Sequence, residues 1–261
     1  MTEQAVRPVV VKLGGSTLGA HDTSLADLAA LARAGGSVVI VHGGGKAITD
    51  WLSRLGSPTR FVRGLRVTDE ASLDIVLGVL AGMVNTQLVA ELARHGAPAV
   101  GLTGADGGLL LVEQADRELG YVGTIVEVRP EILRRLLTAG LVPVVAPIGL
   151  GRSDGALYNL NADTAAGAIA AAIAAERLIF LTDVEGVRDA EGALLATLDE
   201  ARAQALIEAG AIAGGMIPKV EACLAAGRAV IADGRQPGAL ERAMREESGT
   251  LVLGAPARLA T

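Results

Sequence analysis

Short apolar runs alternate with segments of helical periodicity along most of the chain. Residues 9–11 (VVV), 38–41 (VVIV) and 178–181 (LIFL) are continuous apolar runs, typical of strands buried on both faces. Between such runs, apolar side chains recur with the spacing of one helical face, first at residues 25–32 and again at 48–55. This alternation predicts an α/β fold, a three-layer αβα sandwich with a mostly parallel central sheet.

The same patterns indicate the remaining elements. Further strands are expected at residues 99–102, 142–146, 229–231 and 249–253, and further helices around residues 132–137, 165–173 and 220–224. Two segments interrupt the alternation: residues 61–67 (FVRGLRV) predict a hairpin around Gly64, and residues 109–125 predict a short β-excursion. No clear linker divides the chain. If it has two lobes, the turn-rich residues 149–154 mark the boundary, giving lobes of residues 1–150 and 151–261.

The composition argues against nucleic-acid binding. Hydrophobic residues make up 51% of the 261 residues, which is ample for a core, but aromatic residues make up only 2%, and the formal net charge is −6. A nucleic-acid-binding protein ordinarily presents a basic surface, and single-strand binders add stacking aromatic rings. We therefore expect no nucleic acid partner.

Cysteine usage and apolar runs indicate the compartment. Cys223 is the one cysteine, so it cannot form a disulfide within the chain, and its apolar helical surroundings indicate a buried residue. Residues 1–8 are too short and polar for a signal peptide. The longest apolar run, around residues 165–175, is too short to span a bilayer. We expect a cytoplasmic protein with no membrane partner.

Two glycine-rich loops follow predicted strands and precede predicted helices. They are KLGGS (residues 12–16) and HGGGK (residues 42–46). Glycine lets backbone N–H groups approach an anion, and a following helix start adds a favourable partial charge. Two such loops at neighbouring strand ends could hold a transferring phosphoryl group. Neither loop matches a P-loop or a dinucleotide fingerprint, so tight strand–helix turns remain an alternative.

Two lysines are candidates for binding that anion. Lys12 is a charge at the carboxyl end of a buried strand, where parallel α/β sheets bind ligands, and it would be costly there without an anionic partner. Lys219 follows Pro218, which suits the first turn of a helix. Local sequence alone favours a solvated helix lysine at position 219.

Several polar residues follow the other strands. In YNLNAD (residues 158–163), Asn161 or Asp163 could cap the helix that follows, and Asn159 has no capping role. Asp183 follows another strand and could bind ribose, a metal or nothing. Arg66 in the predicted hairpin suits a carboxylate ligand, whereas Arg60 and Arg63 beside it are expected to be surface charges.

Taken together, these segments resemble the amino acid kinase family, and within it the branch that phosphorylates N-acetyl-L-glutamate. The resemblance runs from about residue 9 to residue 253. It rests on the order and spacing of seven motifs, each weak alone: VKLGGS (11–16), VHGGGK (41–46), FVRGLRVTD (61–69), GLTGADGG (101–108), YNLNAD (158–163), LTDVEGV (181–187) and GGMIPKV (214–220).

The resemblance implies a role for each matching residue. Lys12 and Lys219 would stabilise charge on the transferring phosphoryl group, and Asp163 would hold both lysines in place. Gly14, Gly15 and Gly44 would donate backbone N–H groups to phosphate oxygens. The acyl amino acid would lie in the N-terminal lobe on Gly44, Gly45, Arg66 and Asn159, with Arg66 taking its α-carboxylate. ATP would lie in the C-terminal lobe, against Asp183, Val184, Gly186, Val187, Arg188, Ala211, Ile212 and Ala213.

This assignment is consistent with the chemistry. A carboxylate nucleophile is already ionised at neutral pH, so the reaction needs no general base, and the sequence offers no convincing one. Phosphoryl transfer mostly needs alignment and charge neutralisation. The resemblance implies Mg²⁺ held chiefly by the ATP phosphates, and no protein metal ligand is assigned.

The sequence departs from the family pattern in several places, and it leaves two alternative functions open. Asn85-Thr86 stands where an Asn-Lys pair is frequent, and residues 227–233 look abbreviated. Arginine-inhibited members carry an extra N-terminal helix, for which this chain leaves no room before residue 9, so we expect a homodimer insensitive to arginine. The alternatives are a kinase of carrier-bound aminoadipate or glutamate, and a non-catalytic regulatory protein on the same fold.

Overall fold

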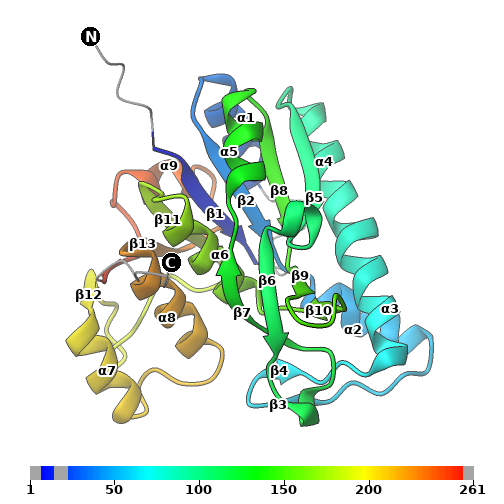
Figure 1. Ribbon diagram of the computed structural model, residues 1–261. Coiled ribbons are helices and arrows are strands. Elements are labelled where there is room, and N and C mark those ends of the chain that lie inside the picture. The colour runs from blue at the N-terminus through cyan, green and yellow to red at the C-terminus, as the bar shows by residue number, and fades with distance from the viewer. Residues whose placement is uncertain (1–6, 15–22, 255–261) are drawn as a thin grey trace.

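The central layer is one eight-stranded sheet, and the computed structural model describes residues 7–14 and 23–254 (Figure 1). The strand order is β12-β14-β13-β11-β1-β2-β8-β5, and every neighbouring pair is parallel except β13 and β14. The strands are β1 (Val9–Leu13), β2 (Val38–His42), β5 (Ala99–Thr103), β8 (Val142–Ala146), β11 (Arg177–Thr182), β12 (Thr197–Asp199), β13 (Arg228–Asp233) and β14 (Thr250–Leu253). The predicted mostly parallel sheet is confirmed.

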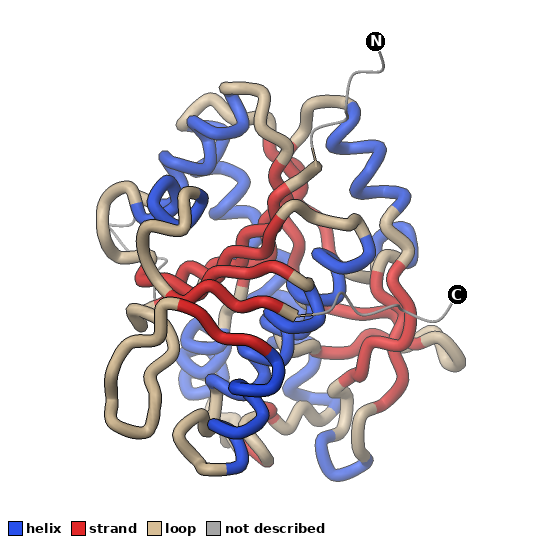
Figure 2. Tube along the Cα trace, turned by 90° about the vertical axis from the view of Figure 1, so that its left-hand side faces the viewer, coloured by secondary structure: helices blue, strands red, loops and turns tan. Residues whose placement is uncertain are grey.

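Helices cover both faces of this sheet, as the two views in Figures 1 and 2 agree. One face packs against α5 (Glu131–Thr138), α6 (Ala162–Ala172), α7 (Glu200–Glu208) and α8 (Met216–Ala226). The other packs against α1 (Ser24–Arg33), α2 (Gly45–Arg54), α3 (Glu70–Leu77), α4 (Asn85–Arg94) and α9 (Ala239–Met244). The result is the predicted three-layer αβα sandwich, because each face of a continuously apolar sheet must be buried against another layer.

Alternation along β1 decides which layer each side chain meets. Val9, Val11 and Leu13 lie in the core on the α1 side, and Val10 lies in the core on the α6 side. Successive side chains of a strand point to opposite faces, so Lys12 points with Val10 toward α6. The register of β1 thus directs its lysine to the layer that carries α6 and α8.

A second, smaller sheet lies beside the central one. Its order is β10-β9-β6-β7, built from β6 (Leu110–Gln114), β7 (Gly123–Val128), β9 (Ile148–Gly151) and β10 (Leu157–Asn159). Two short 3₁₀ turns accompany it, at Asp106–Gly108 and Arg117–Leu119. The sequence indicated β-structure at residues 109–125 only. The lobe boundary proposed at residues 149–154 falls on the hairpin that joins β9 to β10.

The predicted hairpin around Gly64 is present as β3 (Phe61–Val62) and β4 (Leu65–Arg66). Arg63 and Gly64 both have positive φ, 50° and 79°, which is the left-handed turn that glycine accepts without strain.

A long helical segment, Glu70–Arg94, joins α3 and α4 through a π-helical stretch, Gly78–Val84. By length and composition alone it is apolar enough to cross a membrane. The sequence reading placed the longest apolar run at residues 165–175 and missed this segment, because polar residues break its run of apolar letters. In the fold, Val76, Leu80 and Leu88 pack into the core on the α1 side.

Candidate functional site

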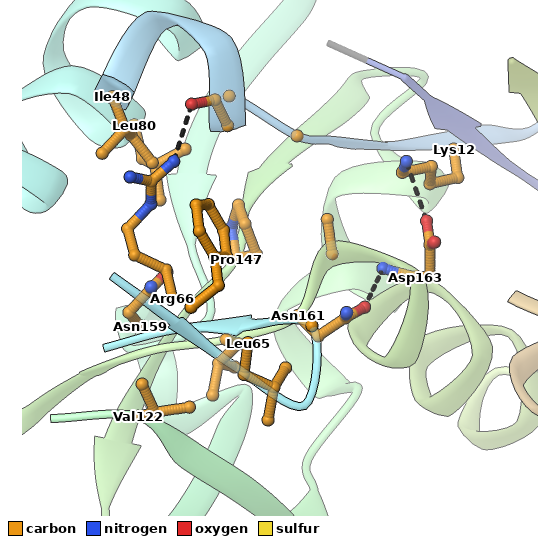
Figure 3. A pocket seen from close by; sticks show the side chains of 17 residues that line it. Lys12, Ile48, Leu65, Arg66, Leu80, Val122, Pro147, Asn159, Asn161 and Asp163 are labelled. Carbon is orange, nitrogen blue, oxygen red and sulfur yellow. Dashed lines mark hydrogen bonds and ion pairs between the residues drawn. The ribbon is translucent and has the colours of Figure 1, made fainter. Parts of the chain in front are cut away.

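Lys12 and Asp163 meet at the carboxyl end of the central sheet. Lys12 Nζ lies 2.7 Å from Asp163 Oδ1, and both side chains are almost fully buried (Figure 3). Asp163 projects from the first turn of α6, which packs directly on β1. The pairing follows from the strand alternation that turns Lys12 toward α6.

Asn161 leaves Asp163 available for this pairing. Asn161 is the N-cap of α6, and its Oδ1 accepts hydrogen bonds from the backbone N–H groups of Asp163 and Thr164 at 2.8 and 3.1 Å. The capping role that the sequence left open between the two residues therefore belongs to Asn161. Asp163 needs no backbone partner and can turn its carboxylate to the lysines.

Lys219 completes the cluster from α8. Its Nζ lies 2.9 Å from Asp163 Oδ2 and 4.9 Å from the centre of the buried Phe180 ring. Lys219 is only 7% exposed, so the local reading of a solvated helix lysine is wrong. Local sequence could not show how closely α8 packs on α6. The two helices are so close that a Cβ on Gly167 would lie 2.7 Å from the Ala222 carbonyl oxygen.

The cluster carries a net positive charge in a desolvated place. Burial lowers the pKa of Lys12, although neighbouring Asp163 opposes the shift. Burial alone would raise the pKa of Asp163, but Lys12 and Lys219 together hold it below its ordinary value, so the carboxylate is ionised. Two ammonium groups on one carboxylate leave about one positive charge for an incoming anion.

Lysine is an unusual choice in this chain. The chain has three lysines, Lys12, Lys46 and Lys219, among 23 lysine and arginine residues. Two of the three lie in the cluster, whereas surface cations are mostly arginine. An ammonium is a compact point charge that can approach a single oxygen, which an arginine fork cannot do in so narrow a space.

A cavity of about 250 Å³ opens beside the cluster. Its wall carries Lys12 and Asp163 on one side and Arg66 on the other, as Figure 3 shows. Polar and backbone groups of Gly43, Gly44, Gly45, Asn159 and Asn161 line it between these ends, and its apolar wall is formed by Ile48, Phe61, Leu65, Leu80, Val122, Pro147 and Leu160. The cavity therefore joins two positive ends through a partly apolar middle.

Arg66 is the cation at the far end. It is 8% exposed, and its Nη2 donates to the Gly45 carbonyl and to Thr49 Oγ1, both at 2.8 Å. Its Nη1 is buried without a hydrogen-bond partner among the described residues, and burial lowers the pKa of the guanidinium. A guanidinium remains charged even so, and the Nη1 donors are available to a ligand carboxylate. Arg60 and Arg63 are exposed, as the sequence indicated.

Asn159 lies beside Arg66 and is held by a residue that the sequence analysis did not single out. Its Nδ2 donates to Thr68 Oγ1 at 3.2 Å, and Thr68 Oγ1 donates to the Arg66 carbonyl at 3.1 Å. Thr68 also exchanges backbone hydrogen bonds with Leu119 and Tyr121 on either side of Gly120. Thr68 thus joins the hairpin, Asn159 and the small sheet. Its place in the motif FVRGLRVTD was the available signal.

The two glycine loops are placed differently from one another. Gly44 precedes α2, which starts at Gly45, and both line the cavity. The Gly14 N–H donates to the Leu181 carbonyl at 3.0 Å, so a phosphate oxygen would have to share or displace that bond. Gly15 lies outside the described residues.

The residues expected to bind nucleotide lie apart from this cavity. Asp183, Val184 and Arg188 are exposed in the loop after β11. Gly186 is buried in that loop, and Ala211 and Ala213 flank Ile212 between α7 and α8. Val187 and Ile212 are core residues, 1% and 2% exposed, so their side chains cannot line an open pocket and only their backbones could face a ligand. Across residues 7–14 and 23–254, no three His, Cys, Asp or Glu residues gather as a metal site.

Comparison with known proteins gives a consistent picture. The sequence pattern of the amino acid kinase family matches residues 7–232. The chain is 44% identical over 254 residues to the acetylglutamate kinase of Dinoroseobacter shibae, covering 94% of this chain and 88% of that one. It is 42% identical over 264 residues to the acetylglutamate kinase of Dehalococcoides mccartyi, covering 97% of each.

One solved structure is informative about the fold. It is an N-acetylglutamate synthase from Neisseria gonorrhoeae in complex with coenzyme A and N-acetyl-glutamate. The TM-score is 0.82 at 27% identity, and the match covers 96% of this chain and 60% of that one.

Proposed function

The chain belongs to the amino acid kinase family, and from that membership we propose that it transfers the terminal phosphoryl group of ATP to the γ-carboxylate of N-acetyl-L-glutamate. The product is N-acetyl-L-glutamyl 5-phosphate, an intermediate of arginine biosynthesis. The relatives named acetylglutamate kinase, similar over nearly the whole chain, support this acceptor.

The observation that carries the proposal is the cavity with a cation at each end. Lys12 lines one end, where Asp163 also pairs with Lys219, and Arg66 lines the other. A dicarboxylate such as N-acetylglutamate has one carboxylate for each end. Arg66 binds the α-carboxylate through its unpaired Nη1, and the γ-carboxylate then lies near Lys12.

The reaction follows from that placement. An oxygen of the γ-carboxylate attacks the γ-phosphorus of ATP, the bond to the β-phosphate bridging oxygen breaks, and ADP leaves with the electron pair. Lys12 and Lys219 neutralise the charge on the transferring group and on the leaving oxygen. Asp163 keeps the two ammonium groups on the side of the cavity where that charge lies.

The nucleotide belongs in the C-terminal half. We propose that residues 1–150 bind the acyl amino acid and form the dimer contact, and that residues 151–261 bind ATP. The loop carrying Asp183, Val184 and Gly186 leaves the same sheet edge as Lys12, which supports this assignment. Mg²⁺ would be held mainly by the ATP phosphates, where it offsets their negative charge.

The chain would act as a cytoplasmic homodimer. The exposed side of the Glu70–Arg94 helix carries small residues, among them Gly82, Thr86 and Ala90, and β5 is an edge strand of the central sheet. A flat face of small residues beside an open sheet edge supports close packing of a second copy.

Two alternative functions make different demands on the site. A kinase for carrier-bound aminoadipate or glutamate would need its acceptor to extend out of the cavity toward the carrier. In this chain, Phe61 and Leu65 of the hairpin form part of the cavity wall, which favours a small free acceptor. A non-catalytic regulatory protein would have no need of the buried trio Lys12, Asp163 and Lys219.

An acyl-phosphate assay separates these possibilities. The purified protein is incubated with MgATP and either N-acetylglutamate, glutamate or aminoadipate, and acyl phosphate is trapped with hydroxylamine. We expect hydroxamate from N-acetylglutamate well above the other two. Folded protein that makes no hydroxamate from any of the three refutes a kinase function on these free acids, and a preference for glutamate or aminoadipate over N-acetylglutamate supports the first rival.

A further inference from the structure

A buried histidine lies directly behind the second glycine loop. His42 is the last residue of β2, is 0% exposed, and precedes Gly43 and Gly44, which line the cavity. Its Nδ1 lies 2.8 Å from the Gly43 carbonyl oxygen, and its Nε2 lies 3.1 Å from Nδ2 of Asn85. Neither His42 nor Asn85 has a part in the mechanism above.

The contacts of Asn85 decide which ring nitrogen carries the proton. Asn85 Nδ2 is also 2.8 Å from the Val144 carbonyl oxygen, which can only accept a hydrogen bond, so this amide atom is the donor. His42 Nε2 must then accept from Asn85. The ring proton is on Nδ1, and Nδ1–H donates to the Gly43 carbonyl.

That hydrogen bond orients the next peptide unit. The Gly43 carbonyl and the Gly44 N–H belong to one planar trans peptide, so they point in opposite directions. With the carbonyl turned back to His42, the Gly44 N–H turns away from the ring, on the side where Gly44 lines the cavity. The histidine thereby fixes the direction of a backbone donor on a residue that lines the cavity.

Asn85 is itself held in place by the π-helical stretch and by Gly101. It is the first residue of α4, directly after the π-helical stretch Gly78–Val84, and is 5% exposed. A Cβ on Gly101 of β5 would lie 2.0 Å from Asn85 Oδ1, so only glycine admits the amide. In the same stretch, Leu80 packs on Gly44, where a Cβ would meet Leu80 Cδ2 at 2.6 Å. The π-helical stretch therefore supports both the contact between Asn85 and His42 and the second glycine loop. Such stretches often lie at functional sites.

We propose that Asn85 and His42 are a positioning pair which fixes the His42 tautomer and thereby directs the Gly44 N–H onto the anion in the cavity. Asn85 donates to the ring, the ring donates to the Gly43 carbonyl, and the Gly44 N–H is directed as a consequence. The pair acts through Gly44 and touches neither substrate. The inference rests on the proposed function for the identity of the anion only.

The first test reads the tautomer without any turnover. The ¹⁵N shifts of the His42 ring in the wild-type protein, assigned by comparison with His42→Gln, distinguish Nδ1–H from Nε2–H. We expect the Nδ1–H form. An Nε2–H ring, or rapid exchange between the two forms, overturns the proposal.

The second test uses Asn85→Asp, with Gln87→Glu as the matched control on an exposed position of the same helix. A carboxylate can only accept, so the neutral ring must place its proton on Nε2, and the Gly43 carbonyl loses its donor. Protonation of the ring restores Nδ1–H. The charged groups around the ring are Lys12 of β1 and the introduced carboxylate.

Turnover of Asn85→Asp should therefore depend on pH in a way that the wild type does not. We expect kcat about tenfold below wild type near pH 9, recovering to within about threefold near pH 6, with the KM for ATP within about twofold throughout, because a misdirected oxyanion donor costs less than a deleted one. Gln87→Glu should match the wild type at both pH values. A loss in Asn85→Asp that is equal at both pH values, or no loss at all, overturns the positioning role.

Failure of the proposed function can be distinguished from failure of the positioning pair. If the wild type makes no acyl phosphate from N-acetylglutamate, the acceptor is wrong, and the ring tautomer still decides the positioning pair. If Asn85→Asp does not fold, the tautomer in the wild type decides it alone.

Discussion

The buried trio of Lys12, Asp163 and Lys219 is the strongest residue-scale signature of phosphoryl transfer. Its two lysines share one carboxylate, at 2.7 and 2.9 Å, in a place almost without solvent. Burying this much charge is costly unless the site gains from an anion, which is the situation in the transition state of phosphoryl transfer.

Replacing Lys219 by alanine should separate catalysis from binding. We expect kcat to fall about 100-fold or more, because one cation facing the transferring group is lost, while the KM for ATP changes by less than about tenfold. Steady-state kinetics measure both. Lys46→Ala is the control, since Lys46 is exposed and pairs with Asp50. A Lys219→Ala enzyme with normal kcat would remove Lys219 from the mechanism.

His42 should make stability depend on pH. Burial, which outweighs the hydrogen bond to Gly43, lowers the pKa of His42 to about 4. The unfolded ring takes up a proton below its ordinary pKa of about 6.5, whereas the folded ring stays neutral until about 4, so the unfolded state binds more protons in this window. The free energy of unfolding should fall by up to about 3 kcal/mol as pH drops from about 6.5 to 4.

Urea unfolding across this range measures the loss. Carboxylates titrate in the lower part of the same window, so the comparison is with His42→Leu, which should show a shallower fall. Equal slopes for His42→Leu and wild type would contradict a buried neutral imidazole.

Among the elements, the hairpin of β3 and β4 leads into a close backbone approach between Thr68 and Gly120. Gly120 has φ of 69°, and a Cβ there would lie 2.4 Å from the Thr68 carbonyl oxygen. Thr68 in turn holds the Arg66 backbone and the Asn159 side chain. The position of the two residues proposed to bind the acceptor, Arg66 and Asn159, therefore follows from the contact between Thr68 and Gly120.

Gly120→Ala should loosen this end of the cavity alone. We expect the KM for N-acetylglutamate to rise about tenfold while the KM for ATP stays within about twofold, since a shift of the hairpin moves Arg66 and leaves the lysine cluster in place. Gly155→Ala is a matched control, because Gly155 has the same φ of 69° and an added Cβ would meet nothing within 4 Å. Both substitutions place a Cβ at the same positive φ, and only the Cβ at position 120 meets another atom within 4 Å. A similar rise in KM in both variants would show that the Thr68 contact is not what matters.

At the scale of the whole molecule, the Glu70–Arg94 helix has two faces with different tasks. Its inner face packs into the core and delivers Leu80 and Asn85 to the glycine loop. Its outer face carries the small exposed residues proposed to contact a second copy. This division explains a helix that is apolar enough to resemble a membrane span.

The homodimer gives the whole-molecule prediction. Light scattering should give about twice the 26.4 kDa mass of the chain. Ala90→Glu places a charge on the proposed contact and should shift the mass toward the monomer, whereas Ala201→Glu on exposed α7 should not. A stable hexamer would contradict the proposed assembly.

The sequence by itself determined the layers and indicated several of the residues proposed for the site. Apolar runs bounded by helical periodicity fix a parallel sheet with two helix layers, because each buried face demands a partner. Glycine loops at strand ends, Lys12 and Arg66 were visible for the same reason: each is polar or flexible where the pattern demands apolar or regular structure. The second sheet was visible only in part, since β9 and β10 are too short to show periodicity.

Only the tertiary structure decided how the separate signals combine. Local sequence favoured a solvated Lys219, and the packing of α8 on α6 buried it against Asp163. The choice between Asn161 and Asp163 as helix cap, the hold of Thr68 on the hairpin, and the chain from Asn85 through His42 to Gly44 all depend on contacts between residues far apart in sequence. Periodicity reports which face of an element is buried, and it carries no information about which buried polar groups will meet there.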